Sequence, residues 1–370
     1  MKLGVLTSSR SDYGIYTPLL KKIKQDDFFV LEIIAFGTHL SKSHGYTLCD
    51  IEKDVYDKIH VISSLVSNDD EQSISTSYGL TSLKFADFWA INKYDLVLCL
   101  GDRFEMSAAV QAGIPFGVRY VHFYGGDTTL GAIDNIYRHQ ITLASMLHFT
   151  GTEEARTKVF SLIGRLESVY NVGSLSIDNV MEFEKMEKSA FYGAYGIPDE
   201  EFALITFHPE TISSQNNYDY AIAMRKALYE LSDIIFLVIT MPNADTLGSL
   251  FRDEIALLKW EKPNRVLLIE NFGKTDYFNA LHYSKILIGN TSSGIVEAAS
   301  FGKYVVNVGE RQKGRTQSCN IINASFNEDA IIMATQQALN LGVYKGDNVY
   351  YKEKVVDFIV QILKEYSEKL

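Results

Sequence analysis

Short apolar segments, rich in β-branched residues, alternate with amphipathic stretches along the chain. The length of each segment is typical of a buried strand, and the alternation predicts parallel strands joined by crossover helices. These segments are 3–7, 29–36, 95–100, 120–124, 202–207, 234–240, 265–271, 285–290 and 304–309. The last amphipathic stretch, 351–368, has the periodicity of a single helix.

The strand segments form two series, separated by a polar and charged region at 176–200. We therefore predict an α/β protein with two doubly wound, Rossmann-like domains and a ligand cleft between them. The chain has 370 residues and 46% hydrophobic content, more than one core of usual size accommodates. The expected domains are 1–172 and 173–350, followed by a C-terminal helix over 351–370 that packs back on the N-terminal domain.

Charge and cysteine content exclude several classes of protein. The formal net charge is -11 and no run of Lys and Arg occurs, which argues against a nucleic-acid partner. A single diphosphate needs only a few local donors and stays compatible with this charge. The three cysteines, Cys49, Cys99 and Cys319, lie too far apart for a disulfide framework or a zinc site. We expect no membrane partner and no export signal, and hence a cytoplasmic protein, because no long apolar run occurs.

Polar clusters follow six of the predicted strands. Ligands of open α/β sheets bind beyond the carboxyl ends of the strands, so these clusters are the first candidates for chemistry. They are SSRSDYG (8–14), GDRFE (101–105), GGDTT (125–129), HPE (208–210), NTSSG (290–294) and GERQKGR (309–315). The first turn lacks the G-x-G-x-x-G pattern of nicotinamide dehydrogenases, and we expect no cofactor.

The segment 289–302 places small hydroxyl residues between a strand and a helix. Thr291, Ser292 and Ser293, with Gly294, would let a phosphate approach backbone N–H groups at the helix start. An ordinary Ser/Thr helix cap is an equally good interpretation. Glu297, further along this helix, is a candidate acceptor for ribose hydroxyls, and a solvated glutamate is the alternative.

Four arginines follow strands and are candidates for binding phosphate. Arg311 and Arg315 are four residues apart beside glycines, and a guanidinium group matches the geometry of phosphate oxygens. A solvated surface loop is the alternative. Arg10 and Arg103 add cationic character in the first half of the chain.

Candidate acid and base groups are Asp102, Asp127, Asp134 and His208. Asp134 precedes Arg138 by four residues in a predicted helix, so the two also fit a structural ion pair. His208 directly follows a strand, where a histidine binds phosphate or transfers a proton near neutral pH. No metal site is expected, because other histidines show no metal-ligand spacing: His39, His44, His122 and His139.

In this order, the clusters resemble the UDP-N-acetylglucosamine 2-epimerase family, whose members adopt the two-domain fold of type B glycosyltransferases. The turn S-R-x-D-Y-G after the first strand and G-x-R-Q-x-G-R near the end are similar to the hydrolysing branch, which supplies mannosamine-type precursors of sialic acids. The resemblance covers nearly the whole chain, through 8–14, 37–47, 100–105, 125–145, 171–179, 208–211, 243–246, 289–298 and 309–315.

The resemblance implies roles for particular residues. Asp102, Asp127 and Asp134 match the catalytic carboxylates of the family, and His208 matches its cleft histidine. The family commonly has H-G-G-E where this chain has Tyr124-Gly125-Gly126-Asp127, and Thr291 replaces a common serine. The expected substrate-binding residues are Arg10, His39, Arg103, Arg138, Asn243, Asn290, Thr291, Ser292, Ser293, Gly294, Glu297, Arg311 and Arg315.

The implied reaction converts UDP-N-acetylglucosamine to N-acetylmannosamine and UDP through a glycal intermediate. The same reaction on UDP-N,N'-diacetylbacillosamine, in the legionaminic acid pathway, is one alternative. A type B glycosyltransferase and a non-catalytic nucleotide-sugar sensor are two others. We also expect a homo-oligomer, either a dimer or a tetramer.

Overall fold

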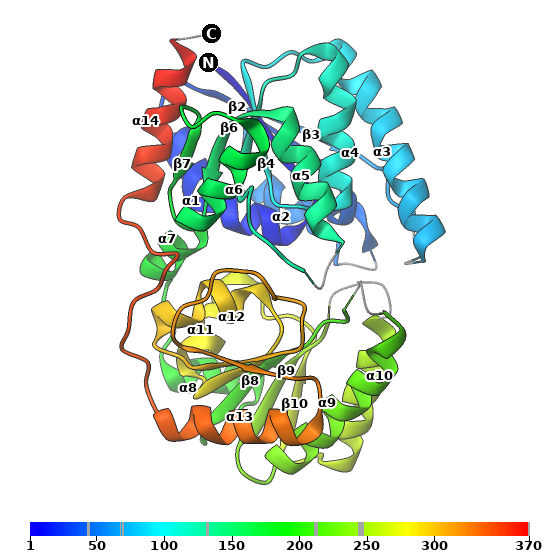
Figure 1. Cartoon of the computed structure of the whole chain (residues 1–370), viewed down its shortest axis with the longest axis vertical. Coiled ribbons are helices and arrows are strands. Elements are labelled where there is room, and N and C mark those ends of the chain that lie inside the picture. Colours follow the sequence, from blue (N-terminus) through cyan, green and yellow to red (C-terminus); the bar gives the residue numbers. More distant parts are fainter. Residues whose placement is uncertain are drawn as a thin grey trace. The chain divides into compact units, whose positions relative to one another are not determined.

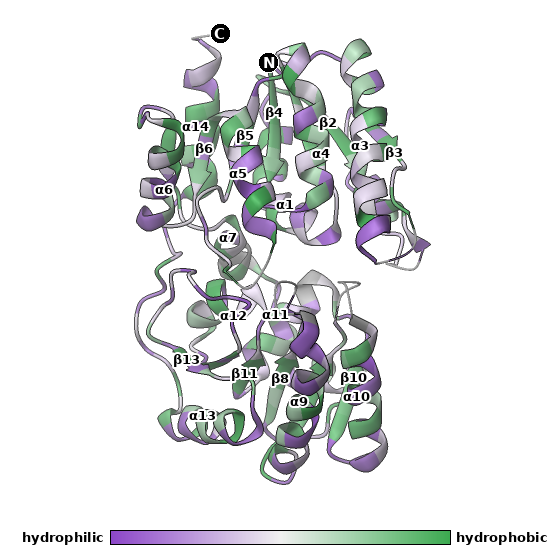
Figure 2. Cartoon of the chain, turned by 45° about the vertical axis from the view of Figure 1, so that its right-hand side comes forward, coloured by the Kyte–Doolittle hydropathy of each residue, from purple (hydrophilic) through white to green (hydrophobic). Residues whose placement is uncertain are grey.

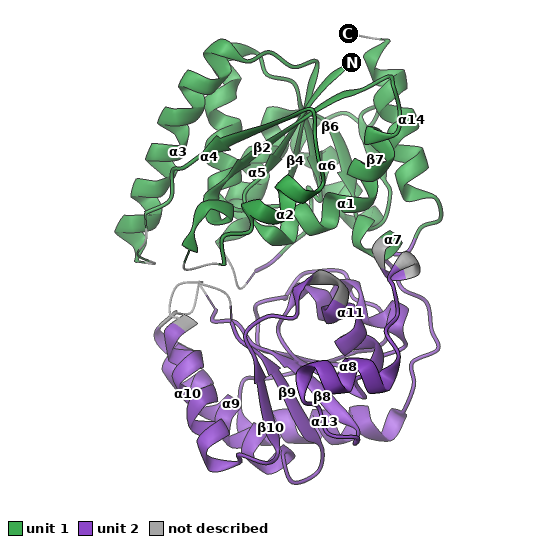
Figure 3. Cartoon of the chain, turned by 180° about the vertical axis from the view of Figure 1, so that it is seen from behind, with its two compact units in different colours: residues 1–128, 133–179, 352–370 green, residues 129–132, 180–351 purple. Residues whose placement is uncertain are grey.

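The computed structural model describes residues 1–42, 45–66, 68, 70–130, 133–210, 214–242 and 248–368. Its contacts divide the chain into two compact units, which Figure 3 colours separately. Unit 1 comprises Met1–Thr128, Ile133–Asn179 and Lys352–Leu370. Unit 2 comprises Thr129–Ala132 and Val180–Tyr351.

Unit 1 contains a 7-stranded parallel sheet in the order β3-β2-β1-β4-β5-β6-β7. The strands are β1 (Lys2–Thr7), β2 (Val30–Phe36), β3 (Lys58–Ile62), β4 (Leu96–Leu100), β5 (Tyr120–Phe123), β6 (Ser145–Thr150) and β7 (Val169–Asn171). The helical segments are α1 (Arg10–Lys24), η1 (Gly37–Leu40), α2 (Leu48–Lys53), α3 (Glu71–Ile91), α4 (Phe104–Gly113), η3 (Ile114–Phe116), α5 (Asp134–Ala144), α6 (Glu153–Ile163), α7 (Leu175–Glu182) and α14 (Val355–Ser367). Helix α7 begins in unit 1 and continues past Asn179 into unit 2.

Helices cover both faces of this sheet, which explains the continuous apolar strands in the sequence. Along β4, Leu96, Leu98 and Leu100 belong to one core cluster, which also contains side chains of α1 and α14. The alternate residues Val97 and Cys99 belong to another, with α3 and α4. The period of two follows from the pleat of a strand. Figure 2 shows the strands in hydrophobic colours and many outward helix turns in hydrophilic ones.

Helix α14 belongs to unit 1 although it ends the chain (Figure 1). Its buried side chains include Val355, Ile359 and Leu363, which recur with the spacing of one helix face. They join the core cluster that includes α1. An ion pair of 2.7 Å between Lys22 Nζ and Asp357 Oδ1 borders this contact.

Unit 2 contains a 6-stranded parallel sheet in the order β10-β9-β8-β11-β12-β13. Its strands are β8 (Phe202–Thr206), β9 (Phe236–Thr240), β10 (Val266–Ile269), β11 (Ile286–Gly289), β12 (Val305–Val308) and β13 (Ile321–Ala324). The helical segments are α8 (Lys188–Tyr195), η4 (Ser214–Asn216), α9 (Asn217–Leu231), α10 (Gly248–Glu261), α11 (Gly273–Tyr283), α12 (Ser292–Val296), η5 (Ala298–Phe301) and α13 (Glu328–Leu341).

Both sheets confirm the predicted doubly wound α/β class. The strand order reverses between β1 and β4 in unit 1, and between β8 and β11 in unit 2. Ligands of open α/β sheets bind outside the carboxyl ends of the strands at such a reversal. The loops that follow β4, β8 and β11 carry Asp102, His208 and Asn290, and Arg10 begins the helix that follows β1.

Across the described residues, no helix combines the length and apolar character that a membrane span requires.

Candidate functional site

Arg138 of α5 joins two of the predicted acid/base loops in unit 1. Its side chain is 1% exposed, and its Nη2 donates to the carboxylate of Asp102. Its Nη1 donates to the backbone carbonyl of Asp127 at 2.8 Å and to Asn135 Oδ1 at 2.6 Å. The loops after β4 and β5 are thereby tied to one guanidinium group. This burial favours a positioning role for Arg138 over the direct substrate contact expected from the sequence.

Asp134 is the first residue of the same helix, one turn before Arg138. The free N–H groups and the dipole of a helix start favour a carboxylate there. Asp102 and Asp127 reach this helix through the hydrogen bonds of Arg138. The structure therefore brings the three predicted aspartates to one end of α5.

The turn that carries Asp127 is held by close packing. A Cβ atom on Gly126, at φ +82°, would lie 2.1 Å from the carbonyl oxygen of Ala155. The Tyr124 hydroxyl accepts a hydrogen bond of 2.7 Å from the Leu175 N–H, at the start of α7. Tyr124, which stands where the family commonly has histidine, thus uses its polar group to hold a helix of unit 1.

Asp12 is a buried carboxylate in the first turn of α1 that we did not single out from the sequence. It accepts hydrogen bonds from the Ser8 and Ser9 N–H groups at 2.8 and 3.1 Å and forms a capping box with Ser9. Burial raises its pKa to about 6, although the nearby charge of Arg103 and the hydrogen bonds oppose this shift. The three-residue spacing of Ser9 and Asp12 was the available signal.

His39 lies fully buried at the end of β2, between two threonines. Its Nε2 is 2.9 Å from Thr7 Oγ1, and its Nδ1 is 2.8 Å from Thr47 Oγ1. Burial lowers its pKa to about 4, and the charge of Arg103 contributes, so the ring is neutral at pH 7. This arrangement favours a structural role in fixing the loops after β1 and β2.

Arg103 is held by a fork of two hydrogen bonds to Glu105, of 3.2 and 3.0 Å. Its side chain is partly exposed, while that of Glu105 is buried. Its charge opposes the rise in the pKa of Asp12 and contributes to the lowered pKa of His39. Arg10 is the exposed first residue of α1.

Asn290 joins three loops of unit 2. It is fully buried, and its Nδ2 donates to the His208 carbonyl at 2.8 Å, while its Oδ1 accepts from the His208 N–H at 2.7 Å. Its own carbonyl accepts from Arg311 Nη1 at 3.2 Å and from Gln312 Nε2 at 2.9 Å. The loops after β8, β11 and β12 are therefore fixed to one another by one asparagine.

Glu210 is a second buried connector in unit 2 that the sequence did not single out. Its Oε1 accepts from the Glu310 N–H at 2.6 Å, across a separation of 100 residues. Burial raises its pKa, and the hydrogen bonds from residues 310 and 311 oppose that rise. A Cβ atom on Gly309, at φ +78°, would lie 2.4 Å from this oxygen. Gly309 therefore allows the loop that carries Arg311 to approach Glu210.

Thr291, Ser292 and Gly294 lie at the start of α12, and their surroundings differ. Thr291 caps the helix, since its Oγ1 accepts from the Ser293 N–H at 3.4 Å, as in the ordinary cap interpretation. Ser292 is exposed, whereas Gly294 is buried where a Cβ atom would lie 2.7 Å from a methyl group of Leu287. Packing therefore explains the glycine, and Ser292 presents its hydroxyl to solvent.

Glu297 and Arg315 flank this part of unit 2. Glu297 ends α12, and its charge contributes to a raised pKa of Tyr277. Arg315 Nη1 donates to Gln312 Oε1 at 3.1 Å, within its own loop. Asn243 lies outside the described residues. Within the described ranges, no group of three or more His, Cys, Asp or Glu residues is arranged to hold a metal ion.

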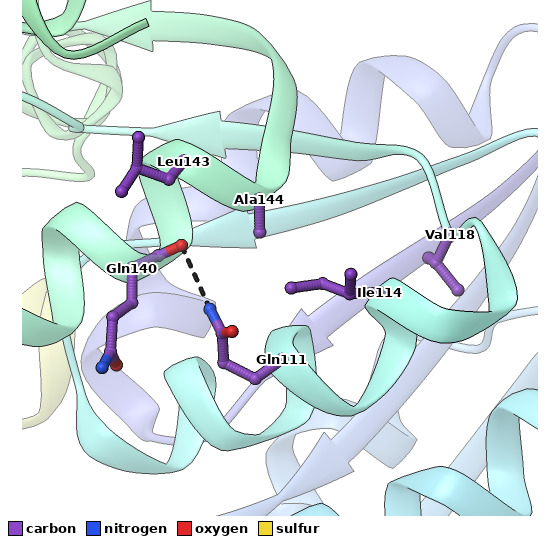
Figure 4. A pocket seen from close by; sticks show the side chains of 6 residues that line it. All are labelled: Gln111, Ile114, Val118, Gln140, Leu143 and Ala144. Atoms are coloured by element: carbon purple, nitrogen blue, oxygen red, sulfur yellow. Dashed lines mark hydrogen bonds between the residues drawn. The ribbon is translucent and has the colours of Figure 1, made fainter.

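A separate hollow lies on the surface of unit 1. Figure 4 shows its lining residues, which come from α4, η3 and α5 and the segment before β5. They are Gln111, Ile114, Val118, Gln140, Leu143 and Ala144. None of the predicted site residues belongs to this lining.

Comparison with known proteins identifies the family. The family model described as UDP-N-acetylglucosamine 2-epimerase matches residues 21–364. The chain belongs to this family. Polysialic acid biosynthesis protein P7 of Escherichia coli is 30% identical over 369 residues, covering 99% of this chain and 94% of that protein. The hydrolysing UDP-N,N'-diacetylbacillosamine 2-epimerase of Legionella pneumophila is 32% identical over 365 residues, covering 98% and 95%.

A solved structure shows the same fold in a more distant family member. The UDP-GlcNAc 2-epimerase of Neisseria meningitidis, bound to UDP-GlcNAc, aligns with a TM-score of 0.81 at 17% sequence identity. The alignment covers 99% of this epimerase chain and 100% of that structure. At this identity the likeness concerns the fold, which agrees with the two doubly wound sheets described above.

Proposed function

We propose that this epimerase is a hydrolysing enzyme, which converts UDP-N-acetylglucosamine and water to N-acetylmannosamine and UDP for the biosynthesis of sialic-acid-type sugars. The observation that carries the proposal is the group of three aspartates at the start of α5, organised by the buried Arg138. The first-turn and C-terminal signatures of the sequence support the hydrolysing branch. The name of the Legionella relative describes a hydrolysing epimerase, which agrees with that branch.

The unit 2 loops are our candidates for the UDP part of the substrate. Asn290 and Glu210 fix the loop of Arg311 from two sides, which reduces the ordering cost of binding a diphosphate there. The Arg311 guanidinium, the exposed hydroxyl of Ser292 and the buried His208 would stabilise the charge that develops on departing UDP.

The unit 1 aspartates are our candidates for the proton transfers. A carboxylate removes the proton at C2 while the bond between C1 and the diphosphate oxygen breaks, which leaves a glycal and UDP. Water then adds its hydroxyl to C1, and a carboxylic acid delivers a proton to the opposite face of C2. Two faces and two transfers suit carboxylates in different surroundings. Asp102 beside a buried arginine and Asp134 at a helix start provide such a difference.

The same chemistry on UDP-N,N'-diacetylbacillosamine is a second candidate function. The Legionella relative, which is named for this substrate, matches nearly the whole chain. This chain also departs from the common H-G-G-E motif of the family at Tyr124 and Asp127, in the loop that we propose to lie near the sugar of the substrate.

The decisive experiment offers each nucleotide sugar separately to the enzyme in D₂O and follows proton and phosphorus NMR on one sample. We expect free sugar of manno configuration with deuterium at C2, and UDP in equal amount. An intact UDP-mannosamine derivative with only traces of UDP would contradict the hydrolytic branch. Turnover of the bacillosamine derivative alone would establish the second candidate in place of the first.

A further inference from the structure

His122 of β5 is a fully buried histidine that the proposed proton transfers do not use. Its Nε2 lies 2.8 Å from the backbone carbonyl oxygen of Gly101, and its Nδ1 lies 3.1 Å from Thr142 Oγ1. A carbonyl oxygen only accepts hydrogen bonds, so Nε2 carries the proton of the first contact. The ring therefore connects the loop after β4 with helix α5.

The ring is neutral near pH 7. Burial lowers the pKa of His122 to about 4, and the charge of Arg138 acts in the same direction, against the hydrogen bond to Gly101 and the charge of Asp102. With the proton on Nε2, Nδ1 presents a lone pair. The Thr142 hydroxyl has one proton and faces two acceptors: it donates to the Arg138 carbonyl oxygen at 2.9 Å, and His122 Nδ1 shares this proton at 3.1 Å.

Both ends of this connection lie next to the acid/base cluster. Gly101 directly precedes Asp102, and because a peptide unit is planar, fixing its carbonyl also fixes the start of Asp102. Thr142 lies one turn after Arg138, which binds the Asp102 carboxylate. A Cβ atom on Gly125 would lie 3.0 Å from both His122 Nδ1 and Thr142 Oγ1. The turn that leads to Asp127 therefore packs directly against these two side chains.

We propose that His122 is a positioning residue for proton transfer at C2: as a neutral Nε2–H imidazole, it holds the Asp102 loop and the Arg138 turn of α5 in register. It does not exchange a proton with the substrate. The kinetic part of this inference rests on the proposed function, whereas the tautomer and the geometry do not.

Three variants distinguish the contributions of the two hydrogen bonds that His122 makes. His122→Phe removes both and keeps an aromatic ring, His122→Gln keeps an amide donor near the Nε2 position, and His122→Asn keeps an acceptor near the Nδ1 position. His148→Phe is the matched control, because His148 is equally buried and pairs with His122 on the neighbouring strand β6. Thermal unfolding and the folded fraction are measured for each variant.

We expect His122→Phe to lower kcat by roughly 10- to 100-fold, since a displacement near 1 Å at a catalytic group has effects of this size. KM and the affinity for UDP should stay unchanged, and His122→Gln should recover part of kcat. His148→Phe should lower the unfolding temperature without lowering kcat per folded molecule. Normal kcat in His122→Phe, or an equal loss in both phenylalanine variants, would overturn the positioning role.

A second measurement does not require turnover. Nitrogen NMR of ¹⁵N-histidine-labelled enzyme, assigned with His122→Gln, should show a neutral Nε2–H ring from pH 8 down to about pH 5. A protonated ring at pH 7, or a neutral Nδ1–H ring, would overturn the proposal. If the unsubstituted enzyme converts neither nucleotide sugar, the proposed function fails, and this spectrum still decides the geometry.

Discussion

Asp102 keeps a quarter of its side chain exposed although its carboxylate is paired with a buried arginine. The pair stabilises the charged carboxylate, and the side chain remains partly accessible to solvent. Asp134 is also partly buried and lies at the start of α5, where the free N–H groups and the helix dipole favour a carboxylate. At the scale of single residues, the candidate carboxylates therefore have distinct environments, as opposite proton transfers require.

We predict that Asp102→Asn and Asp134→Asn each lower kcat by roughly 10²- to 10⁴-fold, because an amide cannot exchange a proton at neutral pH. UDP affinity, measured by calorimetry, should be preserved in both. Asp102→Asn should also lower the unfolding temperature, since it removes a charged partner of a buried guanidinium. Asp199→Asn, an exposed carboxylate paired with Lys188, is the control. Near-normal turnover in either variant would assign that aspartate a structural role only.

Asp12 predicts a pH effect on stability. Its pKa is about 6 in the folded unit and near 3.8 in an unfolded chain, so the folded state holds the proton more tightly. The stability it contributes is present below about pH 4 and is lost as the pH rises through about 6. As the pH rises between these values, the unfolding temperature of Asp12→Asn should therefore increase relative to that of the unsubstituted protein. A difference that stays constant with pH would show that Asp12 does not titrate in this range.

At the scale of elements, the sequence predicts buried strands better than edge strands. The apolar runs locate β1, β2, β4 and β5, whose residues are mostly buried. Predictions from apolar runs missed β3, β7 and β13, which are edge strands with partly exposed side chains. They also missed β6, whose sequence SMLHFT interrupts the apolar run although the strand is internal.

The same distinction applies to the candidate site. The Ser9–Asp12 box and the common face of Asp134 and Arg138 are local patterns, which spacing alone predicts. The bonds from Arg138 to Asp102 and from residue 310 to Glu210 join chain segments 36 and 100 residues apart. Because such contacts depend on which strands become neighbours, local spacing could not reveal them.

The loop after β12 gives a prediction at this scale. Gly309→Ala should weaken UDP binding, because the added Cβ atom meets Glu210 Oε1 at 2.4 Å and displaces the loop of Arg311. Gly164→Ala, at a similar φ of +73° but with no atom within 4 Å of the added Cβ, is the matched control for backbone strain. Arg311→Ala should weaken UDP binding directly. Calorimetry with UDP compares the three, and equal affinities would remove this loop from the nucleotide site.

At the scale of the whole molecule, each unit has its own core. The sheet of unit 1 is covered by two apolar clusters, and that of unit 2 by two others. Neither of the two core clusters of unit 1 includes a residue of the Arg311 loop.

Unit 1 also exposes several large apolar side chains on neighbouring helices. Ile91 of α3 is 81% exposed, Leu143 of α5 is 61% exposed and Ile114 of η3 is 49% exposed. Ile114 and Leu143 line the hollow of Figure 4, at the end of α4 opposite Arg103. Grouped exposure of this kind is typical of interaction surfaces, and in a two-fold dimer the same surface serves both copies.

We predict that the epimerase forms a homo-oligomer in which a second copy covers this surface. Light scattering after gel filtration should give a multiple of the 41.7 kDa chain mass. Leu143→Glu should shift the mass toward one chain, because the substitution places a carboxylate within an apolar contact. Met333→Glu, at a 69% exposed position on α13 of unit 2, should leave the mass unchanged. A single-chain mass for the unsubstituted protein would contradict the oligomer. An unchanged mass in Leu143→Glu would instead place the interface on another surface.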